Sequence, residues 1–234
     1  VEEVARRGRR VGLAEEAGRR VEESRLLIDR MIEEGRPLYG VTTGVGRLER
    51  TSIPRDQIEE LQENLVVSHA AGVGEPLPLD VVRGAMLLRL NLFAKGNSGV
   101  RLELCELLLE MLNRGVHPIV PEKGSVGASG DLAPLAHMAL VMIGRGEALY
   151  AEQRLKGEEA LKRAGLNPIK LKAKEGVALI NGPQVTASLG SLALLDAERL
   201  ARVADIAGAM SVDALKGSTQ PFDERIHALR PYKG

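Results

Sequence analysis

Apolar side chains recur at helical spacing over most of the chain, and short breaks rich in glycine and proline separate the periodic segments. Several segments stop at a glycine, as at Gly115 with Pro118 just beyond, which is a common helix terminator. The last and longest segment places Leu192, Val203 and Met210 on one face. The expected helices span residues 1–34, 54–72, 79–95, 100–114, 131–144 and 188–210.

Two stretches lack this helical period. The segment 39–48, "YGVTTGVGRL", combines three glycines with two threonines and is expected to be a loop. The segment 147–157, "EALYAEQRLKG", is short and mixed and is expected to form a small β-hairpin. The sequence has no internal repeat, no low-complexity tract and no obvious linker. We therefore expect a mainly α fold with a minor hairpin.

Composition and charge restrict the class of protein. The chain has 234 residues, enough for a sizeable core, and its 32 Lys and Arg residues balance its 32 Asp and Glu residues. This balance argues against nucleic acid or an anionic membrane as a partner. No apolar run approaches the ~20 residues that span a bilayer, and the charged N-terminal segment lacks a signal-peptide core. We expect a cytoplasmic protein whose single cysteine, Cys105, is a buried core thiol rather than a nucleophile.

The segment 124–137, "GSVGASGDLAPLAH", places a serine among glycines directly before an apolar helical run. Asp131 is a suitable N-cap, and Pro134 falls in the first turn, where proline is tolerated. No lysine follows to complete a phosphate-binding loop, and Asp131 stands where a nucleophile elbow requires glycine. A tight capped turn is one interpretation.

A second interpretation is chemical. In Ala128-Ser129-Gly130 the amide nitrogen of Gly130 can attack the carbonyl carbon of Ala128, and glycine has the conformational freedom for this approach. Loss of water from the ring and from the Ser129 side chain leaves an exocyclic methylidene, which is a carbon electrophile. The positive end of the following helix dipole would stabilise negative charge that develops there.

This segment resembles the signature of the histidine and phenylalanine ammonia-lyase family, whose self-made cofactor is 4-methylidene-imidazol-5-one (MIO). Further resemblances follow in family order, from about residue 25 to the end of the chain. They are "YGVTTGVGRL", "NLVVSHAAGVGEPLP", "GNSGVR", "EGVALINGPQV" and "ALKGSTQPFDERIHALRP". The resemblance implies a mainly α fold of the fumarase/aspartase-like superfamily. Residues 1–234 would form the N-terminal, MIO-bearing domain of an ammonia-lyase and end at the start of its central helical bundle.

The resemblance also implies roles for individual residues. The catalytic residues would be Ala128, Ser129, Gly130 and Tyr39. The first three would form the MIO ring, and Tyr39 would be an acid or base on a loop over the site. Asn181 would hydrogen-bond the ring or the substrate carboxylate. Without the resemblance, a lone loop tyrosine indicates packing and an asparagine in "NGP" indicates an ordinary turn.

Two more residues would contact the substrate. Gly46 would lie against it, and His69 would bind its ring, as in histidine and tyrosine lyases. A solitary histidine late in a helix is otherwise structural, and we assign that role to His117, His137 and His227. No spacing among the histidines and carboxylates indicates a metal site.

The implied reaction is elimination of ammonia from an aromatic L-amino acid to give a trans α,β-unsaturated acid. "SHAAGVGEPLP" and "KGSTQPFDERIHALRP" are most similar to the histidine branch, whose product is urocanate. Tyrosine and phenylalanine lyases, aminomutases and a catalytically incompetent scaffold remain alternatives. The family's members are longer and form homotetramers, so we expect a homo-oligomer or a C-terminal half as partner. Three residues depart from the family pattern, namely Val45, Asn97 and Pro183.

Overall fold

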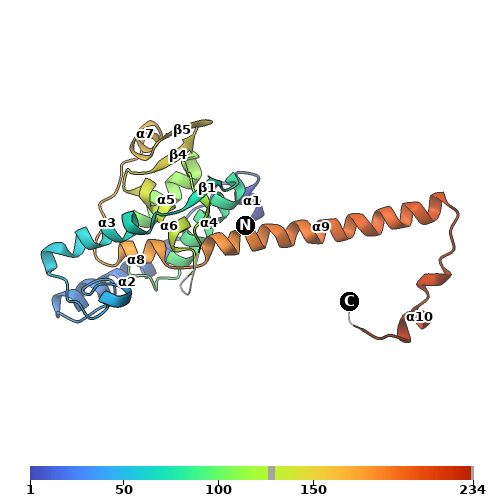
Figure 1. Cartoon of the computed structure of the whole chain (residues 1–234), viewed down its shortest axis with the longest axis horizontal. Coiled ribbons are helices and arrows are strands. Elements are labelled where there is room, and N and C mark those ends of the chain that lie inside the picture. Colours follow the sequence, from blue (N-terminus) through green and yellow to red (C-terminus); the bar gives the residue numbers. More distant parts are fainter. Residues whose placement is uncertain (126–129, 233–234) are drawn as a thin grey trace. The chain divides into compact units, whose positions relative to one another are not determined.

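The computed structural model describes residues 1–125 and 130–232, and the chain divides into two compact units, Val1–Gly190 and Ser191–Gly234. Helices dominate both units, which confirms the prediction of a mainly α fold (Figure 1). The helices of the first unit are α1 (Glu2–Ala5), α2 (Glu15–Glu33), α3 (Ile58–His69), α4 (Leu79–Phe93), α5 (Leu102–Arg114), α6 (Leu132–Met142), α7 (Gly157–Arg163), α8 (Glu175–Ile180) and the start of α9 (Gln184–Ala214).

Some of the predicted helix boundaries are wrong, and α9 extends four residues beyond the predicted 188–210 at each end. The segment 1–34 forms α1 and α2 with an irregular stretch between them, because Gly8 turns the backbone at φ +67°. The helix predicted to run to Gly72 ends at His69, and Ala70 then leaves helical geometry with ψ 59°. By contrast, α5 ends as predicted at Gly115, which adopts the left-handed conformation.

In the described part of the chain, the short strands form two antiparallel sheets. The predicted hairpin is confirmed by β4 (Glu147–Tyr150) and β5 (Gln153–Lys156), which pair with each other. The sequence did not predict that β2 (His117–Pro118) would extend this sheet, or that β1 (Val73–Pro76) would pair with β3 (Pro121–Lys123). Both additional pairings join segments that lie far apart in the sequence.

Helices α3, α6 and α8 pack against one another and form the part of the core on which the candidate site is built. Figure 1 shows α3 and α8 side by side. Their apolar side chains, including Leu65, Leu135 and Leu179, are almost completely buried. Gly176 permits this close packing, because a Cβ atom there would lie 2.4 Å from the backbone oxygen of Gln62.

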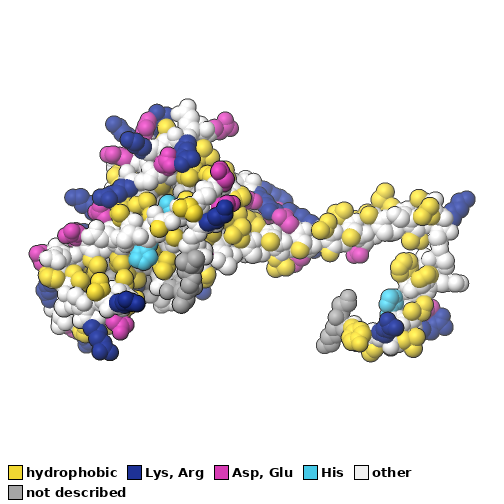
Figure 2. Space-filling model, viewed as in Figure 1, with side chains coloured by type: hydrophobic (Ala, Val, Ile, Leu, Met, Phe, Trp, Pro, Cys, Tyr) yellow, Lys and Arg dark blue, Asp and Glu magenta, His cyan; other side chains and the backbone are white. Residues whose placement is uncertain are grey.

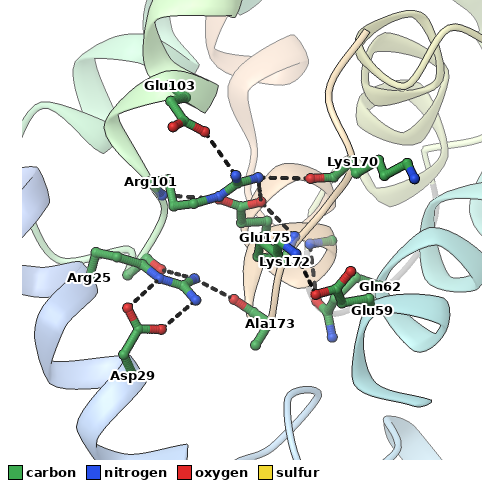
Figure 3. A network of polar contacts seen from close by, with 12 residues as sticks. Arg25, Asp29, Glu59, Gln62, Arg101, Glu103, Lys170, Lys172, Ala173 and Glu175 are labelled. Carbon is green, nitrogen blue, oxygen red and sulfur yellow. Dashed lines mark hydrogen bonds and ion pairs between the residues drawn. The ribbon is translucent and has the colours of Figure 1, made fainter. Parts of the chain in front are cut away.

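The N-terminal end of α8 is fixed by one buried carboxylate (Figure 3). The side chain of Glu175 is inaccessible to solvent and accepts hydrogen bonds from the Nε and Nη2 atoms of Arg101, at 2.9 Å each. It also accepts from the backbone amides of Arg101 and Lys172, at 3.0 and 2.7 Å. The hydrogen bonds to Glu175 raise the pKa of the Arg101 guanidinium. α8 is thereby attached to the start of α5.

The second unit contains the rest of α9, the short 3-10 helix η3 (Gln220–Phe222) and α10 (Glu224–Ala228). The predicted long helix is confirmed, but its apolar face beyond residue 190 is largely exposed, as at Leu200 (70%) and Met210 (67%). Figure 2 shows hydrophobic side chains along this stretch. No helix in the described ranges is both long and apolar enough to cross a membrane.

Candidate active site

A hollow of about 230 Å³ lies in the first unit where α3, α6, α8 and the loop before η1 (Gly46–Leu48) meet. Four residues predicted from the sequence, Tyr39, Gly46, His69 and Asn181, line it together. The other described residues that line it are apolar: Val45, Leu65, Leu132, Val177 and Ile180. A small, mainly apolar hollow with a few converging polar groups has the form of a small-molecule site.

The loop that carries Tyr39, residues 39–48, is closed by local hydrogen bonds. The backbone amide of Gly46 donates to the phenol oxygen of Tyr39 at 3.1 Å, and Thr43 pairs with Ser52 in an isolated bridge. Gly46 has a φ of +57°, which glycine adopts without strain. The Tyr39 side chain remains 54% exposed, so solvent or a ligand in the hollow can reach it.

His69 lies at the end of α3, and its tautomer follows from its neighbours. Its Nδ1 atom lies 2.8 Å from the carbonyl oxygen of Leu65, which can only accept, so Nδ1 carries the proton. The hydroxyl of Ser68 donates to the same carbonyl at 3.2 Å. Among the described residues none is bonded to Nε2 of His69. In the neutral ring, Nε2 is therefore a hydrogen-bond acceptor available to a ligand.

Asn181 follows the last turn of α8 in an extended conformation, and its backbone is held from both sides. Its amide donates to the carbonyl of Val177 at 3.1 Å, and its carbonyl accepts from Nη1 of Arg89 at 2.9 Å. The same Nη1 atom donates to the carbonyl of Ala178 at 2.9 Å. Burial lowers the pKa of the Arg89 guanidinium to about 10, and the charge of Asp131 opposes this shift.

Gly130 begins the described chain after the gap at 126–129, and it lies against the residue that follows Asn181. Gly130 and Gly182 form a parallel bridge, and the amide of Asp131 donates to the carbonyl of Gly182 at 3.0 Å. Gly130 has a φ of +99°, and a Cβ atom there would lie 2.7 Å from the carbonyl carbon of Gly182. A side chain does not fit at this position.

The remaining two residues of the predicted ring, Ala128 and Ser129, lie outside the described residues. The surroundings of Gly130 fit an MIO group, because closure of the ring requires a glycine in an unusual backbone conformation, and only glycine fits at this position. Leu132, two positions further on, lines the hollow. The three residues that would form the ring therefore end beside the polar groups described above.

Asp131 corrects a detail of the sequence analysis. It occupies the N-cap position of α6, but its carboxylate makes no capping hydrogen bond. Both oxygens are instead used by neighbouring segments: Oδ1 accepts from the hydroxyls of Ser125 and Thr186 at 2.6 Å each, and Oδ2 from the amide of Thr186 at 2.8 Å. The buried carboxylate thus attaches the start of α9 to Ser125 and to the start of α6.

Three polar side chains around the site were missed by the sequence analysis: Gln62, Arg89 and the carboxylate of Asp131. Gln62 and Arg89 are both completely buried. The signal for Arg89 was present, since it interrupts the apolar run "AMLLRLNLF". Gln62 gave no such signal, because a glutamine on an amphipathic helix is usually a surface residue.

Within the first unit, His117, His137 and Cys105 do not line the hollow. His117 is buried against Arg83, and burial together with that charge lowers the pKa of its imidazole to about 4. His137 accepts from the amide of Gly72 through Nε2 at 3.0 Å, and burial lowers its pKa. Cys105 is buried, which confirms its predicted position, and burial raises its pKa to about 12. In the described ranges no group of His, Cys, Asp or Glu side chains could hold a metal ion.

This fold is that of the ammonia-lyases and aminomutases. The phenylalanine aminomutase of Pantoea agglomerans superimposes with a TM-score of 0.92 at 36% identity, over 99% of this chain and 45% of that one. The histidine ammonia-lyase structure from Trypanosoma cruzi gives a TM-score of 0.89 at 40% identity, over 100% of this chain and 45% of that one.

Sequence relatives agree with this class. The histidine ammonia-lyase of Anaeromyxobacter dehalogenans is 56% identical and that of Caldanaerobacter subterraneus is 53% identical, each over 100% of this chain. The alignments cover 47% and 46% of those proteins, so the chain spans just under half their length. The family model for aromatic amino acid lyases matches residues 1–234. The chain belongs to the aromatic amino acid lyase family.

Proposed function

We propose that this chain contributes the MIO-forming half of a histidine ammonia-lyase, which eliminates ammonia from L-histidine to give trans-urocanate. The observation that carries the choice of a substrate ring with a hydrogen-bond donor is the tautomer of His69. Its Nδ1 proton is donated to the carbonyl of Leu65, which leaves Nε2 as an acceptor at the hollow. An imidazole N–H on the substrate can donate to this atom.

The same argument disfavours phenylalanine, whose ring has no donor. Placing a phenyl ring against Nε2 of His69 would remove that atom from water without a replacement hydrogen bond, at a cost of about 1–3 kcal/mol. A tyrosine phenol could donate equally well, so His69 alone does not separate the histidine and tyrosine branches. The histidine ammonia-lyases at 52–56% identity favour histidine.

The MIO group from Ala128, Ser129 and Gly130 would supply an electrophilic carbon that turns the substrate amine into a leaving group. Proton transfer and substrate binding would be carried out by the chain's own side chains. The Tyr39 phenol, at the rim of the hollow, is placed to move a proton to or from the substrate. The side-chain amide of Asn181 is available as a donor to a carboxylate, because no described residue is bonded to it.

Helix α6 adds an electrostatic contribution. Its 11 residues begin at Leu132, so its positive end lies beside Gly130 and the hollow. A helix N-terminus stabilises negative charge by roughly 0.3–1 kcal/mol when exposed and up to about 2 kcal/mol when partly buried. This favours the carboxylate of an amino acid and any negative charge that develops during elimination.

We also propose that the exposed apolar side chains of the second unit contact further polypeptide, either a C-terminal half or other copies in a homotetramer. Their number and exposure support this, since a large apolar surface is seldom left in water. Examples are Leu200, Val203, Ile206, Met210, Leu215 and Leu229, each at least 59% exposed.

The activity is tested with the longest natural polypeptide that contains this sequence. It is incubated separately with L-histidine, L-tyrosine and L-phenylalanine, and both ammonia and the unsaturated acid are measured. Ammonia with equimolar urocanate from L-histidine, at a kcat/KM at least about tenfold above the other two substrates, is the expected result. Faster elimination from tyrosine or phenylalanine would contradict the assignment, as would a β-amino acid product, which indicates an aminomutase.

A further inference from the structure

Gln62 connects the three segments that carry the polar residues of the hollow. Its side chain, on α3, is inaccessible to solvent. Nε2 donates to the carbonyl of Gly40 at 2.9 Å, and Oε1 accepts from the backbone amides of Gly176 at 3.0 Å and Val177 at 3.4 Å. The orientation of the amide is determined, since the reverse one would place its NH₂ group against two N–H donors.

The partners of this amide lie directly beside residues of the site. Gly40 follows Tyr39 in the sequence. Val177, in the first turns of α8, itself lines the hollow, and Asn181 follows the same helix. His69 is seven positions after Gln62 on α3, which places the two on one side of that helix. Figure 3 shows Gln62 next to the charged network that anchors the start of α8.

The packing around this amide leaves little free space. Gly40 has a φ of +65°, and a Cβ atom there would lie 2.5 Å from Cγ2 of Val177. The loop therefore touches α8 immediately after Tyr39. Because the segments are so close, a small shift of the Gly40 carbonyl would change the position of the Tyr39 side chain relative to Asn181.

We propose, on the basis of the proposed function, that Gln62 is a positioning residue that fixes the Tyr39 loop against α8 for proton transfer. The two halves of the amide have different effects. The oxygen satisfies first-turn amides of α8, which is a structural contribution. The NH₂ group holds the Gly40 carbonyl and acts on the reaction through Tyr39.

A double-mutant cycle tests whether the effect of Gln62 on the reaction depends on Tyr39. Gln62→Met, which has a similar length but no donor or acceptor, is measured in the parent and in a Tyr39→Phe background. We expect kcat to fall at least about tenfold in the parent, and less than about twofold further once the Tyr39 hydroxyl is absent. Equal losses of kcat in both backgrounds would overturn the proposal, because Gln62 would then act independently of Tyr39.

Asn113 provides a matched control. Its side-chain amide also bridges two segments, accepting from the amide of Val11 at 3.0 Å and donating to its carbonyl at 2.9 Å, but it does not line the hollow. Asn113→Ala should lower the free energy of unfolding and leave kcat unchanged. A comparable loss of kcat in this variant would show that weakened packing alone explains the effect of Gln62→Met.

A second measurement on the 234-residue chain does not depend on activity. Hydrogen exchange of the amides in residues 38–48 should become at least about tenfold faster in Gln62→Met, while exchange in α4 and α5 stays the same. Unchanged exchange in 38–48 would overturn the proposal even if the parent proves inactive, whereas faster exchange with an inactive parent would contradict only the proposed function. If Gln62→Met does not fold, Gln62→Glu at alkaline pH replaces it, since an ionised carboxylate accepts but cannot donate to Gly40.

Discussion

The backbone amide of Asp131 donates to the carbonyl oxygen of Gly182 at 3.0 Å. This hydrogen bond joins the residue directly after the predicted MIO ring to the residue that follows Asn181. It brings Gly130 so close to Gly182 that a Cβ atom on Gly130 would lie 2.8 Å from the same carbonyl oxygen. The two segments that would supply the electrophile and a substrate-binding amide are therefore held together by backbone contacts.

Gly130→Ala should disrupt this arrangement. The added methyl group meets backbone atoms of Gly182 and Pro183 and must also adopt a φ of +99°. We expect the free energy of unfolding to fall by roughly 2–4 kcal/mol and the site to lose its geometry. Chemical denaturation measures this loss. Gly190→Ala is the control, because a Cβ atom on Gly190 meets nothing within 4 Å and should stabilise α9 by up to about 1 kcal/mol. Similar changes of the unfolding free energy in both variants would show that the backbone of Gly182 and Pro183 does not exclude a side chain at Gly130.

Glu175→Gln should weaken the attachment of α8 to α5. The buried carboxylate is the main partner of Arg101, and removing one charge of such a pair costs about 3 kcal/mol. Glu103→Gln removes the other carboxylate bonded to Arg101, but that side chain is 71% exposed, so we expect a change below about 1 kcal/mol. Urea denaturation of the two variants gives the comparison. Equal losses of stability would show that the buried carboxylate of Glu175 stabilises the fold no more than the exposed carboxylate of Glu103.

His69→Phe should change the choice of substrate rather than the fold. Without the Nε2 acceptor, the ratio of kcat/KM for L-histidine over L-phenylalanine should fall at least about tenfold. Ser68→Ala tests the specificity of this effect, because Ser68 bonds the same Leu65 carbonyl without lining the hollow. Competition assays with both substrates measure the ratio. An unchanged ratio in His69→Phe would show that His69 does not recognise the substrate ring.

Protonation of His117 should contribute to acid destabilisation of the fold. Burial and the Arg83 charge lower its pKa from 6.5 to about 4 in the folded protein, so the unfolded state binds the proton first as pH falls. Stability is therefore lost between about pH 6.5 and pH 4, by about 3 kcal/mol in total.

His117→Gln should flatten the dependence of the unfolding free energy on pH over this range. His227→Gln should leave that dependence unchanged, because His227 is exposed at the surface. A pH dependence that is the same in His117→Gln and the parent would show that another group controls the acid response.

The fold was largely predictable from the sequence because helices follow local periodicity. The segments that became α4, α5 and α9 contain their own apolar pattern and stop signals. The pairing of β1 with β3 could not be predicted in this way. These strands have 4 and 3 residues, and their pairing depends on tertiary packing rather than on an alternating pattern.

The site was predictable only through motifs. Tyr39, His69 and Asn181 are far apart in the sequence, and no periodicity places them together; the ordered resemblance to ammonia-lyases did. The buried partners Gln62 and Asp131 were missed for a physical reason. A polar side chain on an amphipathic helix or at an N-cap appears solvated or locally bonded in the sequence, and its long-range partners become evident only in three dimensions.

The intact mass of the purified 234-residue chain tests the central claim most directly, when compared with the encoded mass and with Ser129→Ala. Closure of the ring from Ala128, Ser129 and Gly130 removes two water molecules. We predict a mass lower than the encoded value by two waters in the parent, and a smaller deficit or none in Ser129→Ala, which cannot form the methylidene. A parent chain with its full encoded mass would contradict the account of an MIO-forming segment in this chain.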